Sequence, residues 1–522
     1  MSKTAKATFA LMVVTILSKI LGLLRESVLA SAYGTGVYAA AYTTANSIPI
    51  VLFAIIGSSL ATSLIPLYSR LSVEDSEERA IGFLNTVINI VIIVSIVLSV
   101  IGIVFAGPLV RLFAPGFKGQ TYNLCVNYTR MLLPSLVFVG LANVYTAYLQ
   151  VKKRFVASGI IGMPYSLIII GSIIISINTS PNVLVWGTLL AIASKALIQL
   201  PFLYKEGYKY STRVDLKDPI MKDMMVLILP VVIGVGANQI SAIVDKALAS
   251  LLGANVVSSF AYATRLYEFV QALFIASILA VIFPKLSKLA VSDKMDSFIT
   301  SMKQTINVVL IALVPVVAGC IVLAKPIVEI LLQRKAFTAN DTVMTATILM
   351  IYVTGIIAFS VRDVMSRGFY SMGDSKTPMF NGIIAITLNI ILDLVLIKPL
   401  GYTGLALATS ISAYIALVVF IMTMKKRVEK FTVKDNLIVF AKCLIASLIM
   451  SLVVYFIYYT LGNILVGGFM VKLVRLAASV MVGVVVYIVV MYLSKVEEFM
   501  ILFNMVKNIG KNKIKKVTKC NF

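Results

Sequence analysis

Long apolar segments alternate with short polar or charged connections along the whole chain. A helix that crosses a bilayer needs about 20 predominantly apolar residues. Fourteen segments reach this length, at residues 7–32, 37–67, 81–106, 123–151, 156–177, 183–204, 224–252, 257–283, 305–332, 342–366, 378–397, 402–424, 437–460 and 472–493. The pattern predicts an all-α polytopic membrane protein with 14 transmembrane helices.

The composition agrees with this pattern, because 60% of the 522 residues are hydrophobic and only 13% are charged. This balance excludes a soluble globular protein. The net charge of +24 does not indicate nucleic-acid binding, because the basic residues form short clusters between apolar segments. Their placement, including 152–154, 425–427 and the tail Lys507–Lys519, predicts that the N- and C-termini lie in the cytoplasm.

The chain also matches itself at a nearly constant spacing. Gly34 recurs 219 residues later at Gly253, and Pro66 recurs 218 residues later at Pro284. Such self-similarity predicts the duplication of a six-helix unit, although apolar sequences can also align by chance. An even number of helices gives both copies the same orientation, as in parallel-repeat transporters. The predicted organisation is an N-lobe at 1–215, a C-lobe at 216–430, and helices 13 and 14 with the basic tail at 431–522.

Several charged residues interrupt the predicted membrane helices. Lys19, Arg25 and Glu26 lie in the first one, where each charge costs about 2.5–3.5 kcal/mol at mid-bilayer. Arg265 and Glu268 lie three residues apart in the eighth. The three cations outnumber the two carboxylates, so the five residues together favour an anionic ligand that carries phosphate. The alternative is a set of internal ion pairs that only fasten helices together.

A second set of polar residues offers only oxygen ligands, which hard cations prefer. Two carboxylates close together in hydrocarbon repel each other unless a cation or proton lies between them. The alternative to a cation site is that one of the carboxylates pairs with Lys246 or Lys398. The set consists of Asp245, Asn389, Asp393 and Thr409.

Common motifs of catalysis are missing from the sequence. The chain contains no histidine, no G-x-x-x-x-G-K-[ST] motif, and four cysteines that lie in different segments. These absences make enzyme chemistry inside the membrane less expected.

Lys195 and Gln199 in the sixth helix are a weaker sign of a functional site, and Lys195 is expected to extend towards the cytoplasmic surface.

These residues resemble the MurJ (MviN) lipid II flippase family of the multidrug/oligosaccharidyl-lipid/polysaccharide exporter superfamily, over nearly the whole chain. The resemblance lies in five motifs. They are Ser18-Lys19-Ile20-Leu21-Gly22-Leu23-Leu24-Arg25-Glu26, Tyr262-Ala263-Thr264-Arg265-Leu266 with Glu268-Phe269, Phe337-Thr338 before Asp341, Phe369-Tyr370 with Lys376-Thr377-Pro378, and Asn389 leading into Pro399-Leu400-Gly401 and Gly404-Leu405-Ala406.

The resemblance implies two six-helix lobes around a cationic cavity, with helices 13 and 14 forming a groove for the polyprenyl tail. It implies a protein of the bacterial plasma membrane that is not an enzyme and that serves peptidoglycan synthesis, cell wall biogenesis and cell shape. Lipid II moves from the inner to the outer leaflet by alternating access. We expect membrane potential and/or sodium to drive this movement. Arg25 and Arg265 match the family's essential cavity arginines, while Lys19 and Glu26 stand where Arg and Asp are usual.

The resemblance further implies a sodium site and several partners. The expected partners are lipid II, membrane lipid and cell-wall synthesis proteins, around a chain that is expected to be a monomer. The matching sodium residues are Asp245, Asn389, Asp393 and Thr409, with Leu405 placed to offer a backbone carbonyl.

Two positions depart from the family pattern. Ala40 replaces a usual aspartate, and Phe53 stands where a further cavity arginine is usual. A flippase for another polyprenyl-linked polysaccharide unit therefore stays open as the alternative. A multidrug/cation antiporter of the same superfamily and a non-transporting membrane scaffold stay open as well, and the excess of buried cations opposes the antiporter.

Overall fold

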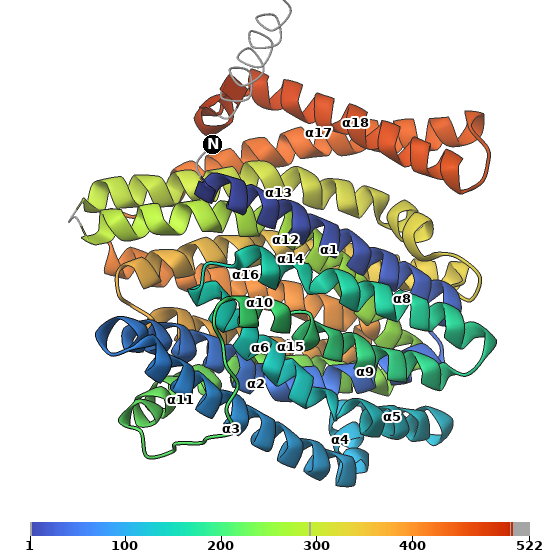
Figure 1. Cartoon of the computed structure of the whole chain (residues 1–522). Coiled ribbons are helices and arrows are strands. Elements are labelled where there is room, and N and C mark those ends of the chain that lie inside the picture. The colour runs from blue at the N-terminus through green and yellow to red at the C-terminus, as the bar shows by residue number, and fades with distance from the viewer. Residues whose placement is uncertain (1–2, 292–293, 502, 505–522) are drawn as a thin grey trace, which may run out of the picture. The chain divides into compact units, whose positions relative to one another are not determined.

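Helices account for nearly all of the chain in the computed structural model, which describes residues 3–291, 294–501 and 503–504. The basic tail Lys507–Lys519 and Cys520 lie outside the described residues. Figure 1 shows the helices. They are α1 (Lys3–Tyr33), α2 (Val37–Glu74), α3 (Glu77–Val104), α4 (Ala106–Phe113), α5 (Gly119–Leu132), α6 (Ser135–Val151), α7 (Phe155–Ile160), α8 (Gly162–Asn178), α9 (Pro181–Leu197), α10 (Leu200–Lys205), α11 (Pro219–Leu252), α12 (Ala254–Val291), α13 (Met295–Leu332), α14 (Ala339–Ser371), α15 (Lys376–Leu400), α16 (Tyr402–Arg427), α17 (Lys434–Ile464) and α18 (Phe469–Leu493).

All fourteen predicted segments are helical, which confirms the all-α class. Among the described residues, ten helices are long and apolar enough to cross a membrane, or eleven if the bent pair α5 and α6 forms one span. The bend between these two helices is 48°, and it falls at Pro134, which lacks a backbone N–H. The protein is thus a polytopic membrane protein, and fourteen spans remain a prediction.

Polar residues at the connections start several helices. The Ser76 hydroxyl accepts a hydrogen bond from the Arg79 backbone N–H at the start of α3 (3.2 Å). The Asp218 carboxylate accepts one from the Ile220 backbone N–H at the start of α11 (3.1 Å), directly before Pro219. These side chains satisfy backbone donors that have no partner inside the helix, and so they set where these helices begin.

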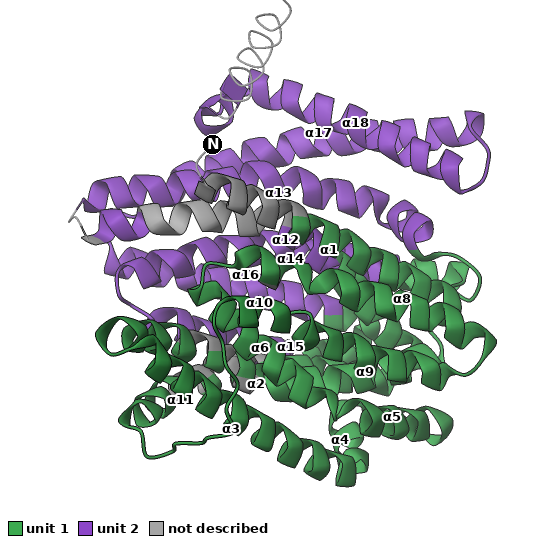
Figure 2. Ribbon diagram, in the orientation of Figure 1, with its two compact units in different colours: residues 1–266, 332–345, 393–405 green, residues 267–331, 346–392, 406–522 purple. Residues whose placement is uncertain are grey.

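The described chain falls into two compact units (Figure 2). Unit 1 takes the chain up to residue 266, together with 332–345 and 393–405, and unit 2 takes the remainder. The core of unit 1 packs α2, α3 and α6 together. The Tyr68 and Tyr148 rings meet edge to face there at 5.5 Å, and the Lys152 ammonium lies 5.7 Å from each ring centroid.

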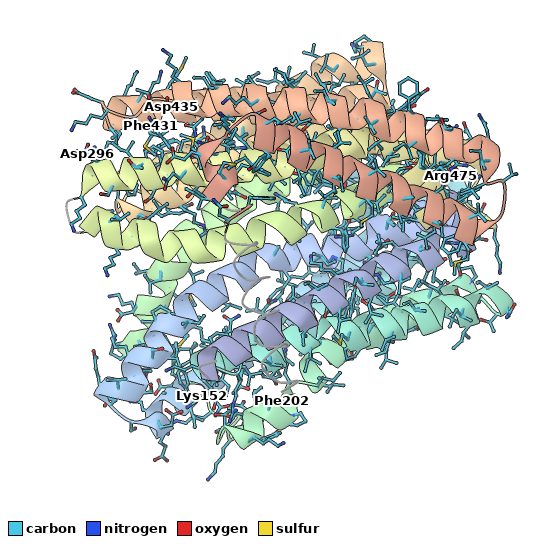
Figure 3. The ribbon with its side chains drawn as sticks, turned by 90° about the horizontal axis from the view of Figure 1, so that it is seen from above. Lys152, Phe202, Asp296, Phe431, Asp435 and Arg475 are labelled. Carbon is cyan, nitrogen blue, oxygen red and sulfur yellow. The ribbon has the colours of Figure 1, made fainter. Side chains whose placement is uncertain are left out.

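In unit 2, α17 and α18 lie side by side as a hairpin (Figure 1). Ion pairs attach both ends of the hairpin to α13: Lys303 to Asp435 at 3.1 Å, and Lys472 to Glu329 at 2.5 Å. Asp435 and Arg475 mark these two ends in Figure 3. The Arg475 guanidinium packs 4.1 Å from the centroid of the Tyr458 ring. Polar contacts at both ends of the hairpin therefore hold the two helices against α13 within unit 2.

The helix bounds recur at the spacing seen in the sequence. The segment 77–113 corresponds to 295–332, 119–151 to 339–371, and 181–205 to 402–427. In the first copy each segment is broken into two helices, whereas in the second copy each is one continuous helix. The recurrence supports a duplication in which the first copy is interrupted where the second is continuous.

Candidate functional site

The first candidate site lies in unit 1, where α1 packs on α8 and α8 packs on α9. Arg25 and Glu26 of α1 form an ion pair at 2.6 Å, with side chains only 15% and 12% exposed. The Arg25 guanidinium lies 5.1 Å from the centroid of the Tyr165 ring on α8. Lys195 on α9 places its ammonium 3.8 Å from the same centroid. One aromatic ring therefore holds two cations from different helices.

Arg265 on α12 belongs to the same neighbourhood. Its charge acts on Tyr165 together with the charges of Arg25 and Lys195, and its own side chain is exposed. We call Arg25, Glu26, Tyr165, Lys195 and Arg265 the cationic cluster. It carries three positive groups and one carboxylate, so a surplus of positive charge remains for an anion.

The cluster has properties suited to phosphate. Arginine presents a planar fork that matches two phosphate oxygens at once, while lysine acts as a compact point charge. The aromatic face stabilises a nearby cation without neutralising it, by about 0.5–2 kcal/mol. Glu26 has a different effect, because it pairs directly with Arg25 and fixes the direction of that side chain.

The remaining predicted residues of this set are Lys19 and Glu268. Lys19 is exposed on α1, six residues before Arg25, which is about 9 Å of helix rise. Glu268 lies one turn beyond Arg265 on α12 but belongs to unit 2. The structure thus brings Arg25, Glu26 and Arg265 into one neighbourhood and adds two residues to them.

The sequence analysis did not place the two added residues in this cluster. Tyr165 gave no signal, since a tyrosine in an apolar helix is usually a packing residue. The sequence analysis did not predict that the Lys195 ammonium lies over the Tyr165 ring. The half-buried ring offers it a favourable interaction inside the unit.

The second candidate site, also in unit 1, is an acidic pair formed by Asp245 on α11 and Asp393 on α15. Their carboxyl groups lie close enough for each to act on the charge of the other. Asp393 is 1% exposed. Within the described part of the chain, no donor reaches the buried oxygens Asp245 Oδ1, Asp393 Oδ1 and Asp393 Oδ2.

The alternative of a lysine partner for Asp245 does not fit this geometry. The Lys246 ammonium donates to Ser47 Oγ at 2.7 Å and approaches the Thr43 carbonyl at 3.4 Å, both on α2. The carboxylate pair therefore needs a proton or a cation from elsewhere, since two buried negative charges repel.

The remaining predicted cation ligands are divided between the units. Leu405 is buried in unit 1, whereas Asn389 and Thr409 belong to unit 2. Asn389 lies one turn before Asp393 on α15 and is 5% exposed. Across the described ranges, no three histidine, cysteine, aspartate or glutamate residues gather as metal ligands. The oxygen-only residues present fit a hard cation better than a transition metal.

The departures from the expected pattern lie in packed surroundings. Ala40 is fully buried, and Phe53 is 1% exposed in the core of unit 1. The Phe53 ring packs against Gly57 and Gly140, leaving less room there than a side chain larger than glycine needs. Apolar packing thus occupies the positions where charges were expected.

Comparisons with known proteins identify several resemblances. The family described as "Lipid II flippase MurJ" matches residues 29–475. A "Probable lipid II flippase MurJ" of Vibrio cholerae is 30% identical over 77% of this chain and 79% of its own length. One of Rickettsia prowazekii is 26% identical over 93% of this chain and 96% of its own.

Solved structures extend the comparison. A structure titled "Lipid II flippase MurJ, inward closed conformation" matches with a TM-score of 0.79 and 25% identity, over 92% of this chain and 98% of the matched chain. An inward-facing multidrug resistance transporter of the MATE family matches with a TM-score of 0.69 but 16% identity, over 79% and 95%. The second match shows a shared fold only.

Proposed function

Because the chain belongs to the MurJ lipid II flippase family, we propose that it moves lipid II from the inner to the outer leaflet of the bacterial cell membrane by alternating access. It is a membrane transporter and not an enzyme. The observation that carries the proposal for this chain is the placement of Arg25 and Lys195 on the Tyr165 ring, with Arg265 close enough for its charge to act on that ring.

In the proposed mechanism the cationic cluster holds the diphosphate of the headgroup. Arg265 is exposed and meets the anion directly, while Arg25 is aimed by Glu26 and supported by the Tyr165 ring. Lys19 attracts the headgroup from the exposed face of α1. Since Glu26 already neutralises one positive charge, the cluster holds the headgroup reversibly, as a transport cycle requires.

The membrane potential supplies a driving force in this proposal. An inside-negative potential favours the outward movement of each net negative charge by about 2.3 kcal/mol per 100 mV. Fourteen transmembrane helices, arranged as two six-helix lobes plus helices 13 and 14 with both termini in the cytoplasm, give the alternating-access framework. The recurrence of helix bounds supports the lobes.

We assign sodium to the acidic pair. The three buried carboxylate oxygens that lack a donor fit a cation, and Asn389, Thr409 and the Leu405 carbonyl are the further oxygens that would hold it. A bound sodium ion supplies positive charge that compensates the two carboxylates. Asp245 and Asp393 join α11 to α15, so occupancy would favour one arrangement of these helices.

Two experiments test the function. In the first, the bacterium is depleted of the protein and lipid II is measured at the outer leaflet, with loss of exposure expected. In the second, a strain that lacks its own lipid II flippase receives the wild-type gene, Arg25→Ala or Arg70→Ala. Arg70 is an exposed arginine paired with Asp223 at 3.0 Å, and so it controls for the loss of an arginine. Growth with wild type and Arg70→Ala, but not with Arg25→Ala, is expected.

A second candidate, flipping of another polyprenyl-linked polysaccharide unit, is favoured by one observation. Phe53 fills a buried position where a cavity arginine was expected, so this chain has fewer cationic contacts. Failure of the wild-type gene to complement the lipid II flippase, together with complementation of a polysaccharide flippase, would favour this candidate. We expect the opposite outcome.

An organic-cation antiporter and a non-transporting scaffold receive less support. The antiporter would bind its substrate with carboxylates, whereas the cationic cluster repels cations. The scaffold would lose thermal stability but no transport in Arg25→Ala. Membrane lipid surrounds the transporter, and we keep a monomer with contacts to cell-wall synthesis proteins as part of the proposal.

A further inference from the structure

A cavity of about 380 Å³ lies in unit 1 where α6 ends, α7 begins and α10 ends. It is separate from the cationic cluster and from the acidic pair. Aromatic and aliphatic side chains form its walls, and basic side chains form its rim. Among its lining residues are Phe155, Ile160, Phe202, Lys153, Arg154 and Lys205.

The rim carries a positive surplus. The Arg154 guanidinium pairs with Glu206 at 2.5 Å, which accounts for the one carboxylate that lines the cavity. Lys153 and Lys205 are exposed, and no hydrogen bond or ion pair reaches their side chains from the described parts of the chain. Two ammonium groups therefore stand beside an apolar cavity.

The side chain of Lys152, the neighbour of Lys153, has partners outside the cavity. Its ammonium pairs with Glu77 and lies over the Tyr68 and Tyr148 rings. Figure 3 labels Lys152 and Phe202 at the same end of unit 1. Of the three consecutive basic residues, only Lys153 thus remains available at the rim.

The backbone at Lys153 adds a second observation. Lys153 ends α6 in the left-handed conformation, with φ of 59°, and the next N–H, of Arg154, donates to the Leu149 carbonyl at 2.8 Å. This helix ending usually uses glycine, because a side chain is strained there. A lysine at this position keeps a charge at the rim despite the strain.

We propose that this cavity binds an anionic phospholipid of the surrounding membrane. The lipid phosphate lies between Lys153 and Lys205, and an acyl chain packs against Phe155 and Phe202. Basic pockets at the ends of membrane helices bind anionic headgroups in this way. The proposal assumes the cytoplasmic placement of this end, where anionic lipid is abundant, but it uses none of the residues assigned to lipid II.

The test uses purified full-length protein in neutral detergent, with phosphatidylglycerol or phosphatidylcholine added, and counts retained lipid by native mass spectrometry. The variant is Lys153→Gly with Lys205→Gln. We expect retention of phosphatidylglycerol to fall by about fivefold per lysine removed, while retention of phosphatidylcholine stays unchanged. Glycine suits the left-handed backbone, so the variant is expected to fold at least as well as wild type.

Lys495→Gly is the matched control. Lys495 also has a left-handed backbone, with φ of 48°, but it follows α18 and does not line the cavity. Unchanged phosphatidylglycerol retention in the double variant would overturn the proposal, as would an equal loss in Lys495→Gly. Both variants are expected to complement the flippase-deficient strain, so failure of this proposal is distinguishable from failure of the transport function.

Discussion

The cationic cluster and the acidic pair are two charged sites of the same unit, but their charged groups differ in whether they have partners inside the protein. The cations have internal partners: Glu26 pairs with Arg25, and the Tyr165 ring faces both Arg25 and Lys195. The carboxylates of Asp245 and Asp393 face each other, with three oxygens that no described donor reaches. The first site is stable while empty of substrate, whereas the second is complete only with a proton or cation.

This difference indicates different roles. A site that must accept and release a large headgroup benefits from charges that are already supported and partly exposed, as Arg265 is. A site that needs a cation to be stable couples occupancy to the packing of its two helices. The comparison therefore favours the proposed roles, in which the first site binds substrate and the second controls conformation.

The largest effect is expected from the double variant Arg25→Ala with Arg265→Ala. Each charge-assisted hydrogen bond contributes about 1.5–3 kcal/mol, so losing both should lower lipid II transport by about 100-fold or more. Transport by purified protein in liposomes measures this, with Arg70→Ala as the control. Transport within a factor of two of wild type would remove substrate binding from the cationic cluster.

The second-largest effect is expected on thermal stability, and it tests the acidic pair without changing the cationic cluster. Asp393→Asn removes the repulsion between two buried carboxylates, so thermal stability without sodium should rise by a few degrees. Sodium should stabilise wild type but not the variant. Thermal unfolding with sodium and with choline measures both. A variant that keeps the full sodium response would exclude Asp393 as a ligand.

A smaller effect tests the aromatic support in the cationic cluster. Tyr165→Phe keeps the ring and should transport within about twofold of wild type, whereas Tyr165→Leu should lose about fivefold, which corresponds to about 1 kcal/mol of cation–π stabilisation. The liposome assay compares the two variants. Equal losses in both would show that the hydroxyl, and not the ring face, supports the cations.

The smallest effect concerns a carboxylate that has donors, in contrast to the acidic pair. Asp374, in the turn before α15, accepts hydrogen bonds from the Thr377 backbone N–H (3.0 Å) and hydroxyl (2.7 Å), which hold its pKa below the ordinary value. Its contribution is present above the pKa of the unfolded chain and is lost as pH falls through the lower folded value.

Asp374→Asn should therefore lower stability at pH 7 by about 1 kcal/mol or less, because the site is close to solvent. It should also reduce the loss of stability between pH 5 and pH 3, an interval set by the ordinary pKa of about 3.9. Unfolding curves at these pH values measure both changes. An identical pH profile in the variant and wild type would contradict the role of these hydrogen bonds.

Hydropathy alone predicted the helices, because spans of this length must satisfy their backbone groups internally. It did not predict all their interruptions. Pro134 signals the break between α5 and α6, and Pro201 follows the break before α10. The break at Ile161, between α7 and α8, likewise has a proline beside it, because Pro164 in the first turn of α8 lacks the N–H that would bond the Ile160 carbonyl.

The sequence also predicted only part of each candidate site. Buried charges are costly, so Arg25, Arg265, Asp245 and Asp393 stood out in the sequence. Helical periodicity places side chains on the face of one helix, but it does not say which helices pack together. The contact of Tyr165 with Arg25 and Lys195 joins three helices, and only the folded chain could show it.

The most direct test of the central claim is the affinity of the purified protein for undecaprenyl diphosphate relative to undecaprenyl monophosphate. If the cationic cluster holds the diphosphate, wild type should prefer the diphosphate by about tenfold or more, and Arg25→Ala should lose that preference. Equal affinities in wild type, or an unchanged preference in Arg25→Ala, would contradict the account.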